Sequence, residues 1–331
     1  MTSDPTKLPE HPKTLTTVIA MTVALLVPAI LTLMNVDAPS TTPPSQNPTP
    51  FGYTISLLLF AMPVAVIGIW FFLHPRQHVD RKAMLCAALA VFILGSILDF
   101  GFGYSFFVFP NPDATLGWRL PAWSWGQMAW VGDYLPIEEF GFYIFGAFFM
   151  ITTYIWADTD WLKVYDHEQR GILALHHRKI INFSPWPIVI AVALIAVAYF
   201  FKKSLPAPHN AGFPAYFTFL CLLAFVPASV LIGSVGKFIN WRAFVFAYAV
   251  LLLVSLVWEA TLGVPYNWWN YQGEQMIGIR ITAWAELPVE AVLLWLAAAF
   301  GAVGAYETFR MYFHLDRPFW QALFGPGPED E

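Results

Sequence analysis

The chain has 331 residues, of which 58% are apolar, 18% are aromatic and only 12% are charged. Soluble domains carry about 25% charged residues, so this composition excludes an ordinary soluble protein and predicts an all-α protein that crosses a membrane several times. A net charge of −5 gives no sign of nucleic-acid binding. Both cysteines, Cys86 and Cys221, lie in apolar segments, so we expect neither a disulfide nor a zinc site.

A membrane-spanning helix needs about 20 mostly apolar residues. Eight segments meet this condition: 14–36, 52–73, 83–107, 130–157, 185–201, 213–235, 243–263 and 283–307. With an even number of spans both termini share one side, and 13 of the 17 lysines and arginines then fall on that side. Because cytoplasmic loops are enriched in Lys and Arg, we expect both termini in the cytoplasm. We also expect the protein to lie in a bacterial inner membrane.

The segments between the spans divide the chain. We expect a cytoplasmic tail over 1–13, a first membrane repeat over 14–157, a cytoplasmic linker over 158–184, a second repeat over 185–310 and a C-terminal tail over 311–331. The first residues are polar and the first apolar stretch is long enough to span, so we expect no cleavable signal peptide. Histidines in the linker could suggest a metal, but a position at the lipid boundary is the preferred explanation, and we expect no metal or cofactor.

Two halves of the chain repeat one pattern. Asp99 and Glu259 each lie 17 residues after a basic residue that opens a span, and Leu-Pro-Ile-Glu-Glu-Phe at 135–140 is echoed by Leu-Pro-Val-Glu-Ala-Val at 287–292. Four spans per copy give both copies the same orientation. The sequence therefore predicts two parallel four-helix repeats, with a site where they meet.

Acidic residues inside or at the edge of a span are costly and are functional candidates by default. Here the candidates for catalysis are Asp99, Glu138, Glu139, Glu259 and Glu290. The spacing places all of them in the outer half of the membrane, and we expect Asp99 to share a cavity with Glu138, and Glu259 with Glu290. A plainer explanation for the glutamates is that acids in a first helical turn complement the helix dipole.

Aromatic residues surround these acids. The candidates for substrate binding are Tyr104, Trp125, Trp130, Tyr134, Trp258, Trp268, Tyr271 and Trp284. An aromatic belt at the membrane interface explains many such residues. Ring faces also attract cations, so carboxylic acids and aromatic rings in an apolar site suit chemistry in which an acid protonates an alkene and the rings shelter the carbocation.

The duplicated Leu-Pro-Ile-Glu-Glu-Phe motif, with an acid and an aromatic-rich loop before it, resembles the membrane-integral lycopene cyclase domains of bacteria, archaea and fungi. The resemblance covers about 50–157 and 210–307. It implies non-redox cyclisation of the end group of a linear carotenoid, with an apolar isoprenoid as substrate. Glu138, Glu139 and Glu290 match the motif, whereas Ala291 stands where the family has a second acid.

Other functions remain open on the sequence alone. One is a related enzyme, either a cyclase of a shorter terpenoid or a hydratase in which water captures the cation. Another is a membrane transporter or a carotenoid-binding protein without activity, since parallel repeats with buried acids also occur in transporters. Few ionisable residues occur in spans one, two and five, which disfavours ion-coupled transport.

Overall fold

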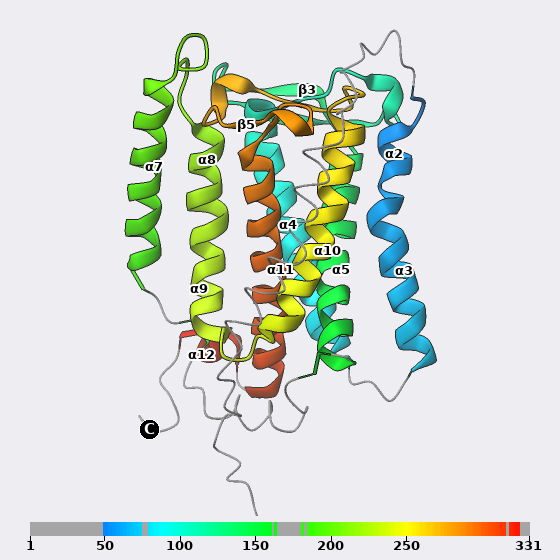
Figure 1. Cartoon of the computed structure of the whole chain (residues 1–331). Helices are drawn as coiled ribbons and strands as arrows, with labels where there is room; N and C mark the ends of the chain where they lie inside the picture. Colours follow the sequence, from blue (N-terminus) through cyan, green and yellow to red (C-terminus); the bar gives the residue numbers. More distant parts are fainter. Residues whose placement is uncertain are drawn as a thin grey trace, which may run out of the picture.

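Seven helices in the structure are long and apolar enough to cross a membrane (Figure 1). The structure is a computed structural model that describes residues 49–74, 79–160, 162–163, 180–181, 184–315 and 318–324. The spans are Gly52–Leu73 (α2, Gly52–Ser56, and α3, Leu58–Leu73), α4 (Arg81–Phe106), α5 (Glu138–Thr159), α7 (Trp186–Ser204), Ala215–Val235 (α8, Ala215–Phe219, and α9, Val226–Val235), Trp241–Gly263 (α10, Trp241–Trp258, and a π-helical turn) and α11 (Val289–Leu315). A short helix, α12 (Phe319–Phe324), follows.

The described spans follow the predicted ones with two corrections. The predicted span 130–157 begins instead at Glu138, because Ala129–Pro136 forms strand β3. Likewise the predicted span 283–307 begins at Val289 and continues to Leu315. Both apolar runs carry a proline where the strand ends, and Pro suits a helix start but not its interior. The predicted span 14–36 lies outside the described residues.

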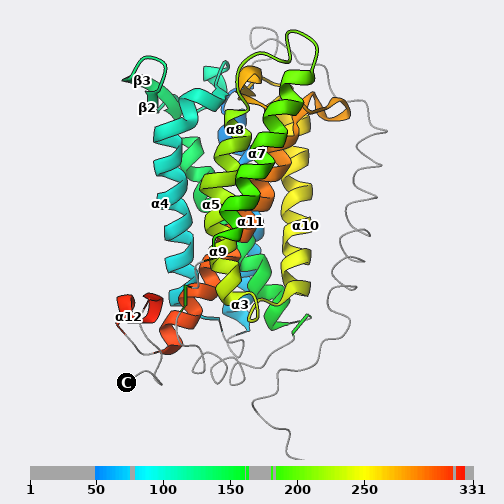
Figure 2. The same ribbon diagram turned by 90° about the vertical axis from the view of Figure 1, so that its left-hand side faces the viewer.

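All short strands gather at one end of the helix bundle (Figures 1 and 2). Strand β2 (Arg119–Ser124) pairs with β3, β1 (Phe107–Val108) pairs with β4 (Asn270–Tyr271), and β5 (Arg280–Ile281) pairs with β6 (Leu287–Pro288), each pair antiparallel. We call the loops 107–137 and 264–288 the strand cap. Helices α4 and α10 run towards this cap, whereas α5 and α11 start from it (Figure 1).

Burial is uneven among the spans. In their most apolar windows, 56% of α5, 67% of the α10 span and 56% of α11 is buried, against 22% of α4 and 17% of α7. The less buried helices expose large apolar side chains, such as Phe72, Ile97 and Val197. Exposed apolar surface on this scale indicates contact with lipid, so α5, α10 and α11 form the centre of the bundle.

A polar network joins the central helices at the end opposite the cap. The Tyr154 hydroxyl of α5 donates to Glu307 of α11 over 2.7 Å, and the Asn240 amide at the start of α10 donates to Asp158 over 2.9 Å. Arg310 lies 3.7 Å from Asp158 and 3.4 Å from Glu307. Buried polar side chains that pair with one another across helices in this way fix the relative position of the helices that carry them.

Candidate active site

The two adjacent glutamates at the start of α5 have different partners. Glu138 accepts hydrogen bonds from the Leu116 backbone amide at 2.7 Å and from the Thr54 hydroxyl at 2.5 Å. Glu139 accepts one from the Tyr53 hydroxyl at 2.5 Å. Neighbouring side chains on a helix point about 100° apart, so Glu138 faces the loop of the strand cap while Glu139 faces the interior of the bundle.

Glu290 has the same kind of partner as Glu138. The backbone amide of Ile277, in the second loop of the strand cap, donates to the Glu290 carboxylate, and Glu290 is fully buried. The next position, where α5 has Glu139, is the buried Ala291. Glu138 and Glu290 therefore hold the loops that precede their helices, and the second half supplies no inward-facing acid at this turn.

Glu259 lies where the regular helix α10 gives way to the π-helical turn Glu259–Gly263. It accepts hydrogen bonds from the Tyr271 hydroxyl and from the Trp295 indole nitrogen, the latter at 2.6 Å. Single π-helical turns are frequent at functional sites because they reorient one side chain. Burial raises the pKa of Tyr271, so this phenol stays protonated at neutral pH and keeps its hydrogen bond to Glu259.

Asp99 lies in the last two turns of α4 and is only 4% exposed. The Tyr143 phenol of α5 lies beside Asp99. The Oδ2 atom of Asp99 has no hydrogen-bond partner within the described residues. Tyr143 follows Glu139 by one helical turn, so the two side chains share a face of α5. Asp99 consequently lies beside the face of α5 that carries Glu139, rather than beside Glu138 as we expected.

Two of the acids line one small chamber. Glu139 and Glu259 face a space of about 40 Å³ that Tyr53, Tyr143 and Tyr271 also line, together with aromatic side chains. Glu290 does not line it, contrary to the expectation that it shares a cavity with Glu259. We call this space the acid chamber.

Three carboxyl groups meet around the acid chamber. Asp99 and Glu259 are both close enough to Glu139 to interact with it electrostatically. None of these three has a basic side chain among its hydrogen-bond partners in the described part of the chain. Adjacent carboxyl groups in apolar surroundings share protons rather than all ionise. The cluster can therefore both donate and accept a proton.

Aromatic rings pack against the acid chamber. The ring centroid of Trp258 lies 4.4 Å from that of Trp269 and 5.3 Å from that of Phe142, which stacks on Trp258. The ring centroids of Tyr53 and Trp269 are 5.0 Å apart. Phe60 stacks on Trp295 at 5.6 Å. Ring faces within about 6 Å of a cation stabilise it, so a positive charge formed in this chamber would meet several rings.

A longer cavity adjoins the chamber. It has a volume of about 260 Å³ and lies between α4, the span 215–235 and α11. Asp99 and Tyr216 line it, and it shares Phe107, Tyr143 and Leu294 with the acid chamber. We call it the lateral groove. Its walls come mainly from helices.

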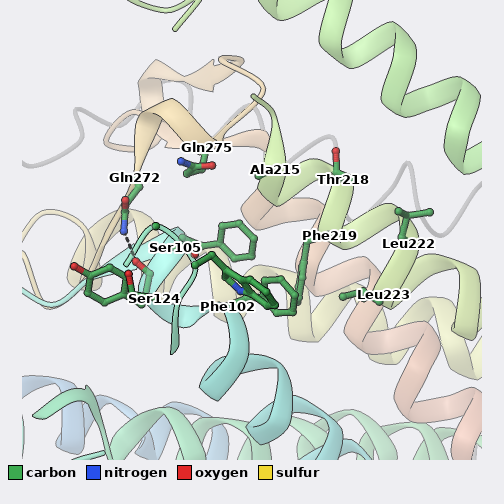
Figure 3. Close-up of a pocket in the computed structure, with 14 residues that line it drawn as sticks. Phe102, Ser105, Ser124, Ala215, Thr218, Phe219, Leu222, Leu223, Gln272 and Gln275 are labelled. Atoms are coloured by element: carbon green, nitrogen blue, oxygen red, sulfur yellow. Dashed lines mark hydrogen bonds between the residues drawn. The ribbon is translucent and has the colours of Figure 1, made fainter. Parts of the chain in front are cut away.

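A third space, the cap pocket, adjoins the cap end of the lateral groove. Figure 3 shows the residues that line it. Its volume is about 580 Å³. Gln272 and Gln275 lie on one side of it and Leu222 and Leu223 on the other (Figure 3). The shared lining residues are Phe102, Phe106, Phe219 and Leu223. The three spaces therefore lie next to one another between the surface beneath the strand cap and the buried acids.

The predicted aromatic residues divide among these places. Trp258 and Tyr271 line the acid chamber, and Tyr104 and Trp125 line the cap pocket. Trp130 is 59% exposed on β3, and Trp284 is buried. Tyr134 donates to the Phe107 carbonyl, and Trp268 donates to Thr49. These last four do not line the three spaces.

Sequence reasoning missed several residues of the site, namely Tyr53, Tyr143, Tyr216 and Trp295. A signal for two of them was available. Tyr143 and Trp295 each lie five residues after the first glutamate of their motif, and each lies beside the deep acid of its own half, Asp99 or Glu259. Tyr53 and Tyr216 had no comparable signal, because they lie in the outer turns of otherwise apolar spans.

Within the described ranges, no group of three or more His, Cys, Asp or Glu side chains has the arrangement of a metal site. Comparison of the chain with protein-family models, curated proteins and solved structures finds no match.

Proposed function

We propose that the protein is a membrane-embedded cyclase that acts on the end group of a linear isoprenoid, as lycopene cyclases do. The observation that supports this most directly is the meeting of Asp99, Glu139 and Glu259, from three helices, in an aromatic-walled interior joined to an apolar groove. An apolar substrate needs shape and few polar contacts. Acid-initiated cyclisation needs a proton donor, a shelter for positive charge and a proton acceptor, and this interior offers all three.

The reaction would proceed in three balanced steps. The protonated Glu139 carboxyl transfers its proton to a terminal double bond, leaving a carboxylate and a carbocation. The π electrons of a second double bond in the same chain then form the new ring bond, which moves the cation to the ring. A carboxylate, Asp99 or Glu259, removes a proton next to the cation and leaves a ring double bond. Mass and oxidation state are unchanged, so no cofactor is needed.

Tyr53 would position the donor. Its hydroxyl bonds Glu139 Oε1, which leaves the other carboxyl oxygen of Glu139 to carry the proton towards the substrate. Trp258 and Trp269 present rings at the chamber where the cation forms. Preorganised groups aimed at a developing charge contribute most in a site from which water is excluded.

We further propose that the two halves form a parallel repeat around this site. The loops of the strand cap support this repeat, because Arg119 pairs with Pro136 in the first half and Arg280 with Pro288 in the second. The Ile137 amide then donates to the Trp118 carbonyl, and the Val289 amide donates to the Ile279 carbonyl. Glu138 and Glu290 then accept from Leu116 and Ile277, which each precede a glycine with positive φ.

Reciprocal contacts across the centre support the same symmetry. The Asn111 amide of the first half donates to the Tyr266 carbonyl of the second, and the Gln272 amide of the second donates to the Tyr104 carbonyl of the first. Strands β1 and β4 pair antiparallel between these contacts. Self-complementary contacts of this form are typical of a twofold axis, here one along the membrane normal.

We propose that the protein lies in the bacterial inner membrane, with both termini in the cytoplasm and the strand cap on the outer side. The distribution of lysines and arginines supports this orientation. The acid chamber then lies in the outer half of the membrane, close to the strand cap that covers it.

The test is expression in bacterial cells that accumulate lycopene, followed by chromatography and mass spectrometry of the extracted pigments. Wild-type protein should yield a cyclic product of unchanged mass. Glu139→Gln keeps size and hydrogen bonding but cannot deliver a proton, and should lower conversion by about 10²–10⁴-fold. Glu138→Gln is the matched control, because Glu138 faces the loop at Leu116, and it should stay active.

The same extract distinguishes the alternatives. A product heavier by one water would show a hydratase. Unchanged lycopene with wild-type protein correctly inserted in the membrane would refute the cyclase proposal for this substrate. Equal conversion by wild type and Glu139→Gln would refute the role of the carboxyl proton.

A further inference from the structure

The lateral groove is long and narrow. On α11 it extends from Leu294 to Ala305, which is about 16 Å at a rise of 1.5 Å per residue. On α4 it extends from Ala90 to Phe106, about 24 Å by the same measure. A volume of about 260 Å³ over this length leaves room for one extended chain. The groove thus runs along the helices, with Asp99 part-way along its α4 side.

Small residues form the floor of the groove, and its mouth faces outward. On α11 the floor consists of Ala297, Ala298, Gly301 and Ala305. At the mouth, Leu94 of α4 is 49% exposed and Leu223 of the facing span is 37% exposed. Both belong to helices that expose further large apolar side chains, such as Leu85 and Leu222. A ligand can therefore enter sideways from the lipid, without passing the strand cap.

Two polar atoms of the groove near the acid chamber lack a partner. The Tyr216 hydroxyl and the Asp99 Oδ2 atom are buried, line the groove and make no hydrogen bond within the described residues. Tyr216 is the second residue of its span, as Tyr53 is in the first half. Tyr53 donates to Glu139, but the second half has Ala291 at the position of Glu139, so Tyr216 has no such carboxylate to bond. An unpaired buried polar group costs about 1–3 kcal/mol unless a ligand or water satisfies it.

The groove is narrower than a protein helix. A volume of about 260 Å³ open to the centre of a water molecule, spread over about 16–24 Å, corresponds to a passage roughly 7 Å wide, against about 10 Å for a helix with its side chains. A single hydrocarbon chain is the occupant of the right width. Because Asp99 lines the groove beside the acid chamber, a chain that carries a reactive alkene suits it better than a saturated acyl chain.

We propose that the lateral groove holds the polyene chain of the substrate, which enters from the lipid between α4 and the span 215–235. This proposal rests on the proposed function. The reactive end lies at Tyr143, which lines both the groove and the acid chamber, and the chain runs along α11 past Gly301. The groove is open on its lipid side, so whatever exceeds its length stays in the membrane. The enzyme therefore selects the end group and accepts long chains one end at a time.

Gly301 offers a direct test. A Cβ added there meets no atom within 4 Å, so a leucine would fill the groove without displacing the backbone. Gly68 of α3 is equally open but lies outside the groove, and Gly68→Leu is the matched control. Both changes remove a helical glycine, which by itself stabilises a helix by up to about 1 kcal/mol. We expect Gly301→Leu to lower lycopene conversion at least tenfold and Gly68→Leu to leave it unchanged.

Binding is measured separately from turnover. Protein carrying Glu139→Gln is purified from lycopene-accumulating cells, and the bound pigment is quantified by absorption and mass spectrometry. Adding Gly301→Leu should remove at least nine-tenths of the bound polyene, while adding Gly68→Leu should not.

The outcomes separate the two proposals. Polyene binding that depends on Gly301, in a protein that converts no lycopene, would support the groove and refute the cyclase. Full conversion or full binding with Gly301→Leu would refute the groove and leave the cyclase standing. Recovery of phospholipid, and no polyene, from the Glu139→Gln protein would refute the polyene as occupant.

Discussion

The glutamates Glu138 and Glu290 should act on stability and not on turnover. Replacing Glu138 by alanine removes two hydrogen bonds, from the Leu116 amide and the Thr54 hydroxyl. Replacing Glu290 removes the bond from the Ile277 amide. Each lost bond is worth about 1 kcal/mol, and up to about 3 kcal/mol where the abandoned donor is buried.

We therefore expect Glu138→Ala to lower the free energy of unfolding by about 2–4 kcal/mol and Glu290→Ala by about half as much. Glutamine retains one carbonyl oxygen as acceptor, so Glu138→Gln and Glu290→Gln should each cost less than about 1 kcal/mol. The assay is the thermal unfolding midpoint of the purified protein in detergent, alongside pigment conversion in cells. A Glu138→Gln protein with a normal midpoint and no activity would refute the assignment, because it would put the Glu138 proton in the reaction.

Three further changes probe the site and its frame. Glu259→Gln should keep its hydrogen bond from the Trp295 indole nitrogen and yet lower lycopene conversion at least tenfold. Normal conversion by this variant would show that Glu259 does not remove the proton. A Cβ on Gly263 would lie 2.1 Å from the Trp269 ring, so Gly263→Ala should lower the free energy of unfolding by about 1–3 kcal/mol. Gly101→Ala is the control, because a Cβ there meets no atom within 4 Å. Equal unfolding midpoints for the two variants would contradict this expectation. Burial raises the pKa of Tyr134 to about 12, so between pH 10 and 12 only the unfolded chain loses this proton and stability falls as pH rises. Tyr134→Phe should make that fall shallower in unfolding midpoints measured from pH 9 to 12, and an unchanged slope would contradict the assignment.

The acids could be found from the sequence because ionisable groups are rare in membrane spans. The equal spacing of Asp99 and Glu259 from a basic residue placed both at the same depth, and the structure has both near Glu139. Which of two adjacent glutamates faces inward could not be found. That choice depends on the rotation of α5, which is set by packing against α3, α4 and α10.

The start of α5 could not be predicted from hydropathy either. The residues Ala-Trp-Val-Gly-Asp-Tyr-Leu-Pro at 129–136 are as apolar as a helix end, but they form β3 because β2 is available as a partner. Strand formation depends on such contacts more than on intrinsic preference. Gln272 was also beyond prediction, since its amide contacts the Tyr104 carbonyl 168 residues away.

The pairing of β1 with β4 has a consequence for synthesis of the protein. Phe107 and Val108 emerge early, but their partners Tyr271 and Asn270 follow only after four more described spans have been made. Contacts between residues so far apart in the chain form late. During insertion, α4 and α5 would therefore carry Asp99 and Glu139 into the membrane without α10, Glu259 or the closed strand cap. Water could reach both carboxyl groups during that interval and hydrate them, so the nascent first half would not yet bear the full cost of burying its acids.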